Sequence, residues 1–177
     1  MTSVISIGPG DGALTLRTGV AGRAARTGHS LTIGFDAWRA DIAFDGDTPV
    51  SVALRVDVDS LQVLSGEGGL TPMTGPERLV ARANALKSLK SSAFPEIVFR
   101  AGGVSASGDG YRLSGDLTIC GVTEPHTVDV AVDGSTVSGQ SAVTQTTFGI
   151  KPYSLMMGAL KVADEVVVTL EASVTVS

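Results

Sequence analysis

The feature that most constrains this fold is an alternation of apolar and polar residues with a period of two, which recurs along most of the chain. It is clearest at residues 50–58, VSVALRVDV, and at residues 165–176, EVVVTLEASVTV. Side chains with this period point alternately to the two faces of an extended strand, so one face can be buried. The expected buried faces hold Val50, Val52, Leu54, Val56 and Val58 in the first stretch, and Val166, Val168, Leu170, Ala172, Val174 and Val176 in the second.

Shorter segments repeat the pattern and give about eight or nine strands in all. They are ALTLR (13–17), HSLTIGF (29–35), RADIAF (39–44), EIVFR (96–100), YRLSGDLTI (111–119), HTVDVAV (126–132) and a noisier stretch at 137–148. Turn-forming Gly, Pro and Asp residues separate several of them, at 44–49, 107–110, 121–125 and 132–135. Such short connections favour antiparallel neighbours.

One segment departs from this rhythm and predicts an α-helix over about residues 76–92. Pro76 suits the first helical position, Lys87 lies where a cation favours the last turn, and Pro95 stops the run. The apolar stripe of this helix is expected at Leu79, Ala83, Leu86 and either Leu89 or Lys90. We therefore expect an amphipathic helix that packs one face on the sheet.

The predicted fold is all-β: a single domain over residues 1–177, in which an antiparallel barrel carries one helix and residues 1–12 are flexible or form an edge. Hydrophobic residues make up 43% of the chain and charged residues 18%, which is ample apolar surface for a core. The 22 glycines and the few aromatic residues indicate small inward-facing side chains. A barrel of about eight strands is just wide enough to hold one small ligand, so an apolar cavity is expected inside it.

Charge and segment composition argue against several kinds of partner and location. The net charge is −5, and there is no long run of Lys and Arg of the kind that nucleic-acid binding requires. No stretch approaches the roughly 20 apolar residues of a membrane-spanning helix. The N-terminal sequence lacks a signal-peptide pattern and the single cysteine cannot form an internal disulfide, so we expect a cytoplasmic protein.

The two histidines, His29 and His126, are each expected to begin a strand on its apolar face. Either each is a hydrogen-bonded histidine at a barrel rim, or each anchors the polar head group of an apolar ligand. No third ligand lies at a suitable spacing, so no metal site is expected. The residues that alternate with them are Leu31, Ile33 and Phe35 for the first, and Val128 and Val130 for the second.

No group of residues in the sequence predicts catalysis. Cys120 lies where a strand runs into a turn and is expected to behave as an inert, small apolar residue. Asp57 and Asp59 share one face of a predicted strand with Arg55, and that face is expected to be solvated. Nucleophile-elbow, zinc-protease and phosphate-loop motifs are all missing from the sequence. We therefore predict a protein that is not an enzyme and needs no cofactor.

Residues 146–166 gather apolar side chains between two strand patterns. Methionine adapts well to irregular apolar surfaces. The segment is either a loop that packs on the core or a gate or wall of the cavity, with Lys151 and Tyr153 able to supply polar contacts. The apolar members are Phe148, Tyr153, Leu155, Met156, Met157 and Leu160.

Three motifs occur in order along the chain: FPEIVF at 94–99, GDLTICGVTEP at 115–125 and FGI at 148–150. With them the chain resembles, over roughly residues 13–175, the YceI-like family of lipocalin-like, polyisoprenoid-binding proteins. The resemblance implies an extended antiparallel barrel of about eight strands whose apolar bore holds a long isoprenoid, such as an isoprenoid quinone or a polyprenyl-type amphiphile. It implies binding without turnover, by a carrier, a buffer or a stress-related lipid binder.

Alternation and resemblance together predict the residues that line this bore. They are His29, Leu31, Ile33, Phe35, Leu54, Val56, Phe99, Leu117, Ile119, His126, Val128, Val130, Phe148, Tyr153, Met156, Met157, Leu160, Val168 and Leu170. Two alternatives stay open: a filled barrel that serves as a structural or protein-interaction module, and an enzyme that acts on a hydrophobic substrate with His29 or His126 as acid or base. A homodimer, the commonest assembly of soluble oligomers, is also open.

Overall fold

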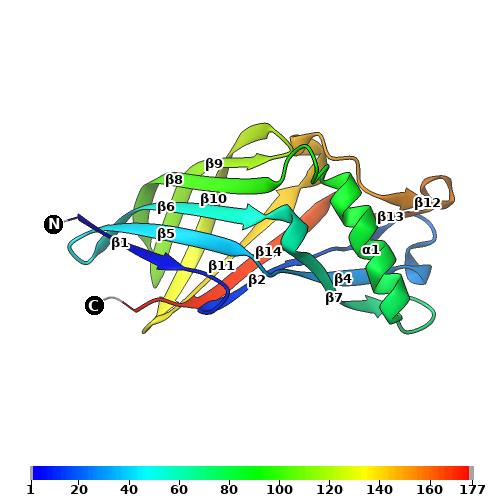
Figure 1. The fold of residues 1–177 in the computed structure, drawn as a ribbon, viewed down its shortest axis with the longest axis horizontal. Coiled ribbons are helices and arrows are strands. Elements are labelled where there is room, and N and C mark those ends of the chain that lie inside the picture. Colours follow the sequence, from blue (N-terminus) through cyan, green and yellow to red (C-terminus); the bar gives the residue numbers. More distant parts are fainter. Residues whose placement is uncertain (1, 176–177) are drawn as a thin grey trace.

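The computed structural model describes residues 2–175, and its dominant feature is one antiparallel sheet of eleven strands (Figure 1). In space the strands follow the order β1-β5-β6-β8-β9-β10-β11-β14-β2-β4-β7. Their bounds are β1 (Thr2–Ile7), β2 (Gly12–Arg17), β4 (His29–Phe35), β5 (Trp38–Asp45), β6 (Thr48–Asp57), β7 (Leu61–Gly68), β8 (Glu96–Ser107), β9 (Gly110–Ile119), β10 (Val122–Asp133), β11 (Thr136–Thr144) and β14 (Glu165–Ser173).

A small three-stranded sheet and several helical segments complete the fold. The small sheet consists of β12 (Ser154–Leu155), β13 (Leu160–Val162) and β3 (Val20–Ala21). One α-helix, α1 (Gly75–Ser88), lies near this sheet at the end of the molecule opposite the two chain termini (Figure 1). The short 3₁₀ segments are η1 (Ala25–Thr27), η2 (Val58–Ser60), η3 (Gln145–Phe148) and η4 (Met156–Gly158).

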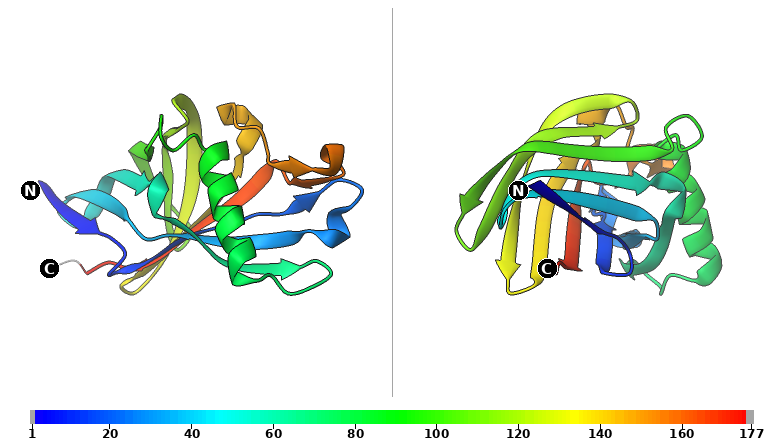
Figure 2. Two further views of the ribbon diagram at one scale, coloured as in Figure 1. Left: turned by 45° about the vertical axis from the view of Figure 1, so that its right-hand side comes forward. Right: turned by 60° about the vertical axis from the view of Figure 1, so that its left-hand side comes forward.

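The large sheet curls into a half-barrel, and α1 lies across its open side next to β7 (Figure 2). This confirms the predicted all-β, lipocalin-like architecture with one helix, but the strand number differs, being eleven where about eight were expected. Two edge strands, β1 and β7, add to the segments that the sequence indicated. β1 falls in the stretch expected to be flexible or to form an edge, and it is an edge strand.

β-bulges explain the misread strands, because each bulge adds one residue and inverts the alternation beyond it. The pairing of β4 with β7 skips Leu64, which is 53% exposed, so β7 shows no clean period of two. The pairing of β5 with β6 skips Val50, which is 40% exposed and not inward as predicted. Val58 is buried but begins η2, and Val176 lies outside the described residues.

The hairpin between β9 and β10 is tighter than the predicted turn at 121–125. Cys120 and Gly121 alone form it, with φ values of 51° and 75°, as a two-residue type I′ turn requires. Pro125 therefore lies inside β10. Its missing N–H is tolerated because β10 pairs with β11 only over residues 129–133, which leaves one side of β10 unpaired near the turn.

The helix forms close to its predicted position but presents a partly different face to the sheet. A capping box at Thr74 fixes its start. The predicted stripe is half right: Leu86 and Leu89 pack against the core, but Leu79 is 69% exposed and Ala83 is exposed. Ala81 and Ala85 pack against the core in their place. Small alanine side chains let the helix approach the sheet closely. Which face of the helix packs on the sheet therefore depends on tertiary packing.

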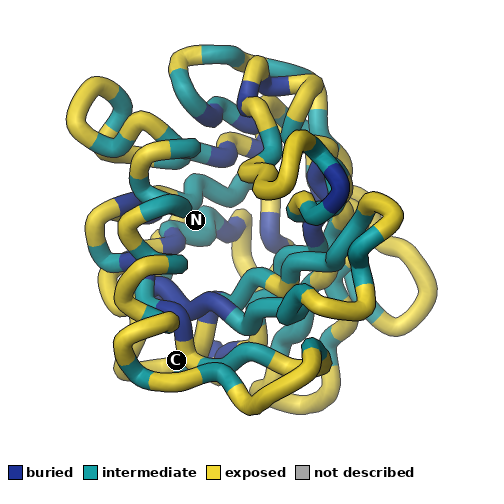
Figure 3. Tube along the Cα trace, turned by 90° about the vertical axis from the view of Figure 1, so that its right-hand side faces the viewer, coloured by how far each residue is buried: buried dark blue, intermediate teal, exposed yellow. Residues whose placement is uncertain are grey.

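Buried side chains form two clusters on the inner face of the sheet. One includes Ile7, Leu14 and Val174, and extends to Leu61 and Val63 beside α1. The other gathers around Phe99 and Phe148. Viewed along the long axis, buried segments lie toward the interior and exposed ones on the periphery (Figure 3). The inner face of the sheet is therefore apolar along its length.

Candidate ligand-binding cavity

The curled sheet encloses a cavity of about 960 Å³, within the size range of small-molecule sites. Every strand of the large sheet except β1 contributes lining residues, and α1 supplies one flank. The walls are mostly Leu, Val, Ile and Ala, because each strand presents its apolar alternate residues inward. Among the described lining residues the charged side chains, apart from histidine, are Glu77 and Lys161. The site is therefore suited to an apolar ligand.

Sixteen of the nineteen residues predicted to line the bore lie in the wall of this cavity. They come from six strands of the large sheet and from the segment that follows η3. Whether they contact a ligand stays a prediction. They are His29, Leu31, Ile33, Phe35, Leu54, Val56, Phe99, Leu117, Ile119, His126, Val128, Val130, Tyr153, Leu160, Val168 and Leu170.

The other three predicted residues lie outside the cavity wall. Phe148 is buried, at 4% exposure, in the second core cluster behind the wall, because η3 turns its side chain into the packed region. Met156 and Met157 are 63% and 105% exposed at the tip of η4. The fold of the small sheet carries this tip away from the barrel, so neither methionine forms a wall.

Sequence reasoning missed several lining residues. Leu14 and Leu16 were recognisable, since they alternate within a predicted strand. Ala81, Asn84 and Ser88 on α1 were not, because nothing local shows which face of the helix meets the barrel.

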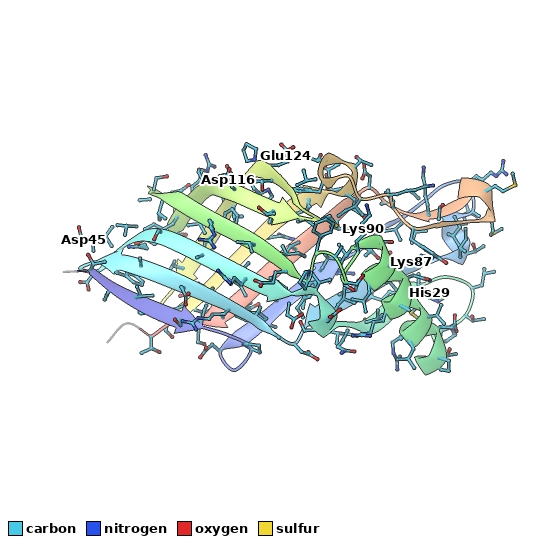
Figure 4. All side chains as sticks on the ribbon, turned by 45° about the horizontal axis from the view of Figure 1, so that its top comes forward. His29, Asp45, Lys87, Lys90, Asp116 and Glu124 are labelled. Carbon is cyan, nitrogen blue, oxygen red and sulfur yellow. The ribbon has the colours of Figure 1, made fainter. Side chains whose placement is uncertain are left out.

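The cavity opens at the end of the molecule farthest from the termini. Four large apolar residues both line the cavity and are solvent-exposed, namely Leu70, Val80, Tyr153 and Leu155, so they mark its mouth. His29 lies beside α1 at this end (Figure 4). Its Nε2 lies 2.7 Å from the carbonyl oxygen of Thr71, which fixes the loop between β7 and α1 at the mouth.

His126 lies in the wall where β10 and β11 separate. Its Nε2 lies 3.1 Å from Oγ of Ser141 on β11, so a side-chain hydrogen bond spans a stretch that no backbone ladder joins. Its ring meets that of Phe99 edge to face, with centroids 5.9 Å apart. Burial lowers the pKa of His126 below its ordinary value of 6.5, because the wall disfavours the charged imidazolium. The neutral ring therefore suits an apolar cavity.

Replacing His126 with Gln should make the folded protein less sensitive to mild acid. The folded-state pKa lies below the unfolded value, so the unfolded chain takes up the proton first as pH falls, and stability present above about pH 6.5 is lost below it. Urea unfolding at pH 7.5 and pH 5 measures this loss. Ser141→Ala, which keeps the histidine, should retain the wild-type pH dependence. Equal losses in wild type and His126→Gln would contradict the assignment.

The candidate reactive groups have structural roles. The thiol of Cys120 donates to the carbonyl of Leu89 at 3.0 Å, and burial raises its pKa, although nearby Lys90 opposes that rise. Such a thiol is a poor nucleophile. Asp57 and Asp59 do not share a strand face, because Asp59 lies in η2 and its N–H donates to the carboxylate of Asp57 at 3.0 Å.

Residues 2–175 contain no cluster of three or more His, Cys, Asp or Glu side chains placed to hold a metal. Within the same range, no helix has the length and apolar character needed to cross a membrane.

Comparisons with known proteins agree with this geometry. A family model described as the YceI-like domain matches residues 15–174. The structure of BcnA from Burkholderia cenocepacia is similar with a TM-score of 0.65 and 20% identity, over 92% of this chain and 96% of that one. The YceI protein of Campylobacter jejuni is similar with a TM-score of 0.59 and 14% identity, over 82% and 84% of the two chains. At these identities the solved structures support the fold alone. No curated protein matches significantly.

Proposed function

Because the chain belongs to the YceI-like family, we propose that it binds a long isoprenoid or similar lipid in its cavity, without catalysing a reaction. An isoprenoid quinone or a polyprenyl-type amphiphile has the chemistry that the walls accept. The protein then acts as a carrier or buffer of this lipid. Its lone, unbridged Cys120 is compatible with work in the reducing cytoplasm.

The observation that carries the proposal is a long cavity with apolar walls. On β9 the lining residues run from Leu113 to Ile119, six residue steps that span about 20 Å at roughly 3.3 Å each. A flexible hydrocarbon chain can occupy such a space. Charged side chains occur only toward the mouth, among the lining residues that the structure describes, so the polar head of the ligand is best accommodated there.

Burial of the chain can supply the affinity by itself. Each buried CH₂ contributes about 0.8 kcal/mol, so ten buried carbons provide roughly 8 kcal/mol, which corresponds to a micromolar Kd before ordering costs. Polar contacts then need only orient the head group. His29 at the mouth and His126 farther in are available for that role.

The alternatives left open by the sequence gain less support. A filled-barrel module needs no interior space, whereas this interior holds about 960 Å³. An enzyme with a histidine as acid or base needs a partner group that orients it. His29 meets a backbone carbonyl and His126 meets a hydroxyl and an aromatic ring, which is better suited to structure and ligand orientation.

The test is direct recovery of lipid from the purified protein. Native mass spectrometry of the intact protein should show an adduct that organic extraction releases as an isoprenoid or related lipid. Delipidated protein should then take up an isoprenoid quinone with one-to-one stoichiometry. A protein that carries no lipid and takes up neither quinones nor polyprenols would refute the proposal.

A further inference from the structure

Three connections surround the mouth of the cavity, and we refer to them as the mouth connections. They are residues 18–28 between β2 and β4, residues 69–74 between β7 and α1, and residues 149–164 between η3 and β14. Each contributes lining residues, among them Val20, Leu70 and Leu155, so whatever covers these connections also covers the entrance. They lie at the end of the molecule opposite the termini (Figure 1).

The mouth connections expose large apolar side chains. Leu70 is 79% exposed, Leu155 48%, Met156 63% and Met157 105%. The two methionines are consecutive residues, and their φ values are 56° and 57°. These values lie in the left-handed region of backbone conformation, which residues other than Gly, Asn and Asp rarely adopt. A strained turn that projects two methionines into water gains no packing within the molecule. Its geometry suits insertion into an apolar phase.

The same connections carry a charge opposite to that of the rest of the chain. They hold Arg23, Arg26, Lys151 and Lys161 against a single acid, Asp164, for a net charge of +3. The remaining residues hold nine Lys and Arg against 17 Asp and Glu, for a net charge of −8. None of the four cations forms a salt bridge with another described residue. An anionic surface would therefore attract the mouth connections and repel the rest of the chain taken together.

We propose that the mouth connections dock on the surface of an anionic lipid bilayer. Met156 and Met157 enter the interface, the four cations meet lipid phosphates, and the cavity mouth faces the membrane. Apolar side chains combined with basic groups are the features by which proteins bind a membrane surface without spanning it. Docking rests on the proposed function for its purpose, which is lipid exchange, but it requires no bound lipid.

Cosedimentation with vesicles tests the proposal on the full chain. The probes are phosphatidylcholine vesicles with and without 30% phosphatidylglycerol, a composition chosen to give a clearly anionic surface. Binding should be about tenfold stronger to the anionic vesicles and should fall in 0.5 M salt, because exposed charges are then screened. Equal binding to both vesicles, or no binding to either, would overturn the proposal.

Matched variants locate the contact. Met156→Ser combined with Met157→Ser should abolish most binding, whereas Val4→Ser combined with Val50→Ser, which also removes two exposed apolar side chains, should not. Arg26→Glu should weaken binding severalfold, whereas Arg100→Glu, with the same change of charge elsewhere on the chain, should leave it near wild type. If each control variant loses as much as its partner, the docking surface is elsewhere.

A second measurement separates this proposal from the proposed function. Uptake of an isoprenoid quinone delivered from ethanol, without vesicles, should be unchanged in Met156→Ser combined with Met157→Ser. Lost vesicle binding with intact uptake supports docking at the mouth. Wild-type protein that takes up quinone but ignores anionic vesicles would refute docking and leave the proposed function standing.

Discussion

Replacing Gly139 with Phe is expected to weaken the binding of a long isoprenoid chain about 100-fold while the fold survives. Gly139 lines the cavity on β11, and a Cβ added there would meet Val130 Cγ2 at 3.4 Å and Val128 Cγ1 at 3.5 Å, which are tolerable contacts. The ring would then occupy the bore beyond these valines. Displacing three or four methylenes at about 0.8 kcal/mol each costs roughly 3 kcal/mol, or two orders of magnitude in Kd.

Chain length provides an internal check on this result. Gly139 pairs with Val130 and Leu170 in the part of the barrel away from the mouth, so a short-chain homologue that does not reach it should bind the variant and the wild type equally. Titration of a series of quinones with increasing chain length into delipidated protein measures the difference.

Gly102→Phe is the matched control. Gly102 is exposed on β8 and nothing lies within 4 Å of its added Cβ, so the same substitution falls outside the cavity. The Gly102→Phe variant should bind quinones of every chain length with wild-type affinity. If Gly139→Phe also binds long chains at full affinity and unfolds at the wild-type urea concentration, the cavity is not the binding site.

Replacing Arg82 with Ala is expected to cost about 2–3 kcal/mol of the free energy of unfolding, because two hydrogen bonds from a charged donor are lost. Arg82 lies on α1, and its Nε and Nη2 donate to the carbonyls of Leu61 and Asp59, each at 2.7 Å. These bonds fasten the helix to the segment that leads into β7. On its other flank the helix is held by the thiol of Cys120, which donates to Leu89.

The loss should also appear in function, since α1 forms one flank of the cavity. A loosened helix should release bound lipid faster than in wild type. Urea unfolding followed by the fluorescence of Trp38, the single tryptophan, gives the stability, and stopped-flow transfer to acceptor vesicles gives the release rate.

Two variants show whether the lost bonds are responsible. Arg82→Met keeps most of the side-chain packing but not the donors, so it should be destabilised nearly as much as Arg82→Ala. Lys87→Ala removes an exposed cation near the end of the same helix (Figure 4) and should cost less than about 0.5 kcal/mol. Wild-type stability in Arg82→Met would show that packing, and not hydrogen bonding, holds the helix.

Where alternation runs unbroken, the sequence predicted the wall of the cavity well. Along β10, His126, Val128 and Val130 point inward at every second position, and the lining confirms this parity. The prediction failed at Val50, and the strand around Leu64 escaped notice, because each lies at a bulge, which depends on pairing with another strand. Because they also depend on contacts with distant segments, β7 and the inward face of α1 could not be predicted from the local pattern.

The sequence by itself determined the all-β class and indicated most of the apolar wall, because a period of two is a local property that each strand carries alone. Its ordered motifs resembled those of the YceI-like family. Only the tertiary structure decided that the sheet stays open at β1 and β7, that α1 covers its open side through small residues such as Ala81, and that Met156 and Met157 stand outside the cavity. Those features depend on register and packing between segments far apart in the chain, for which no local pattern codes.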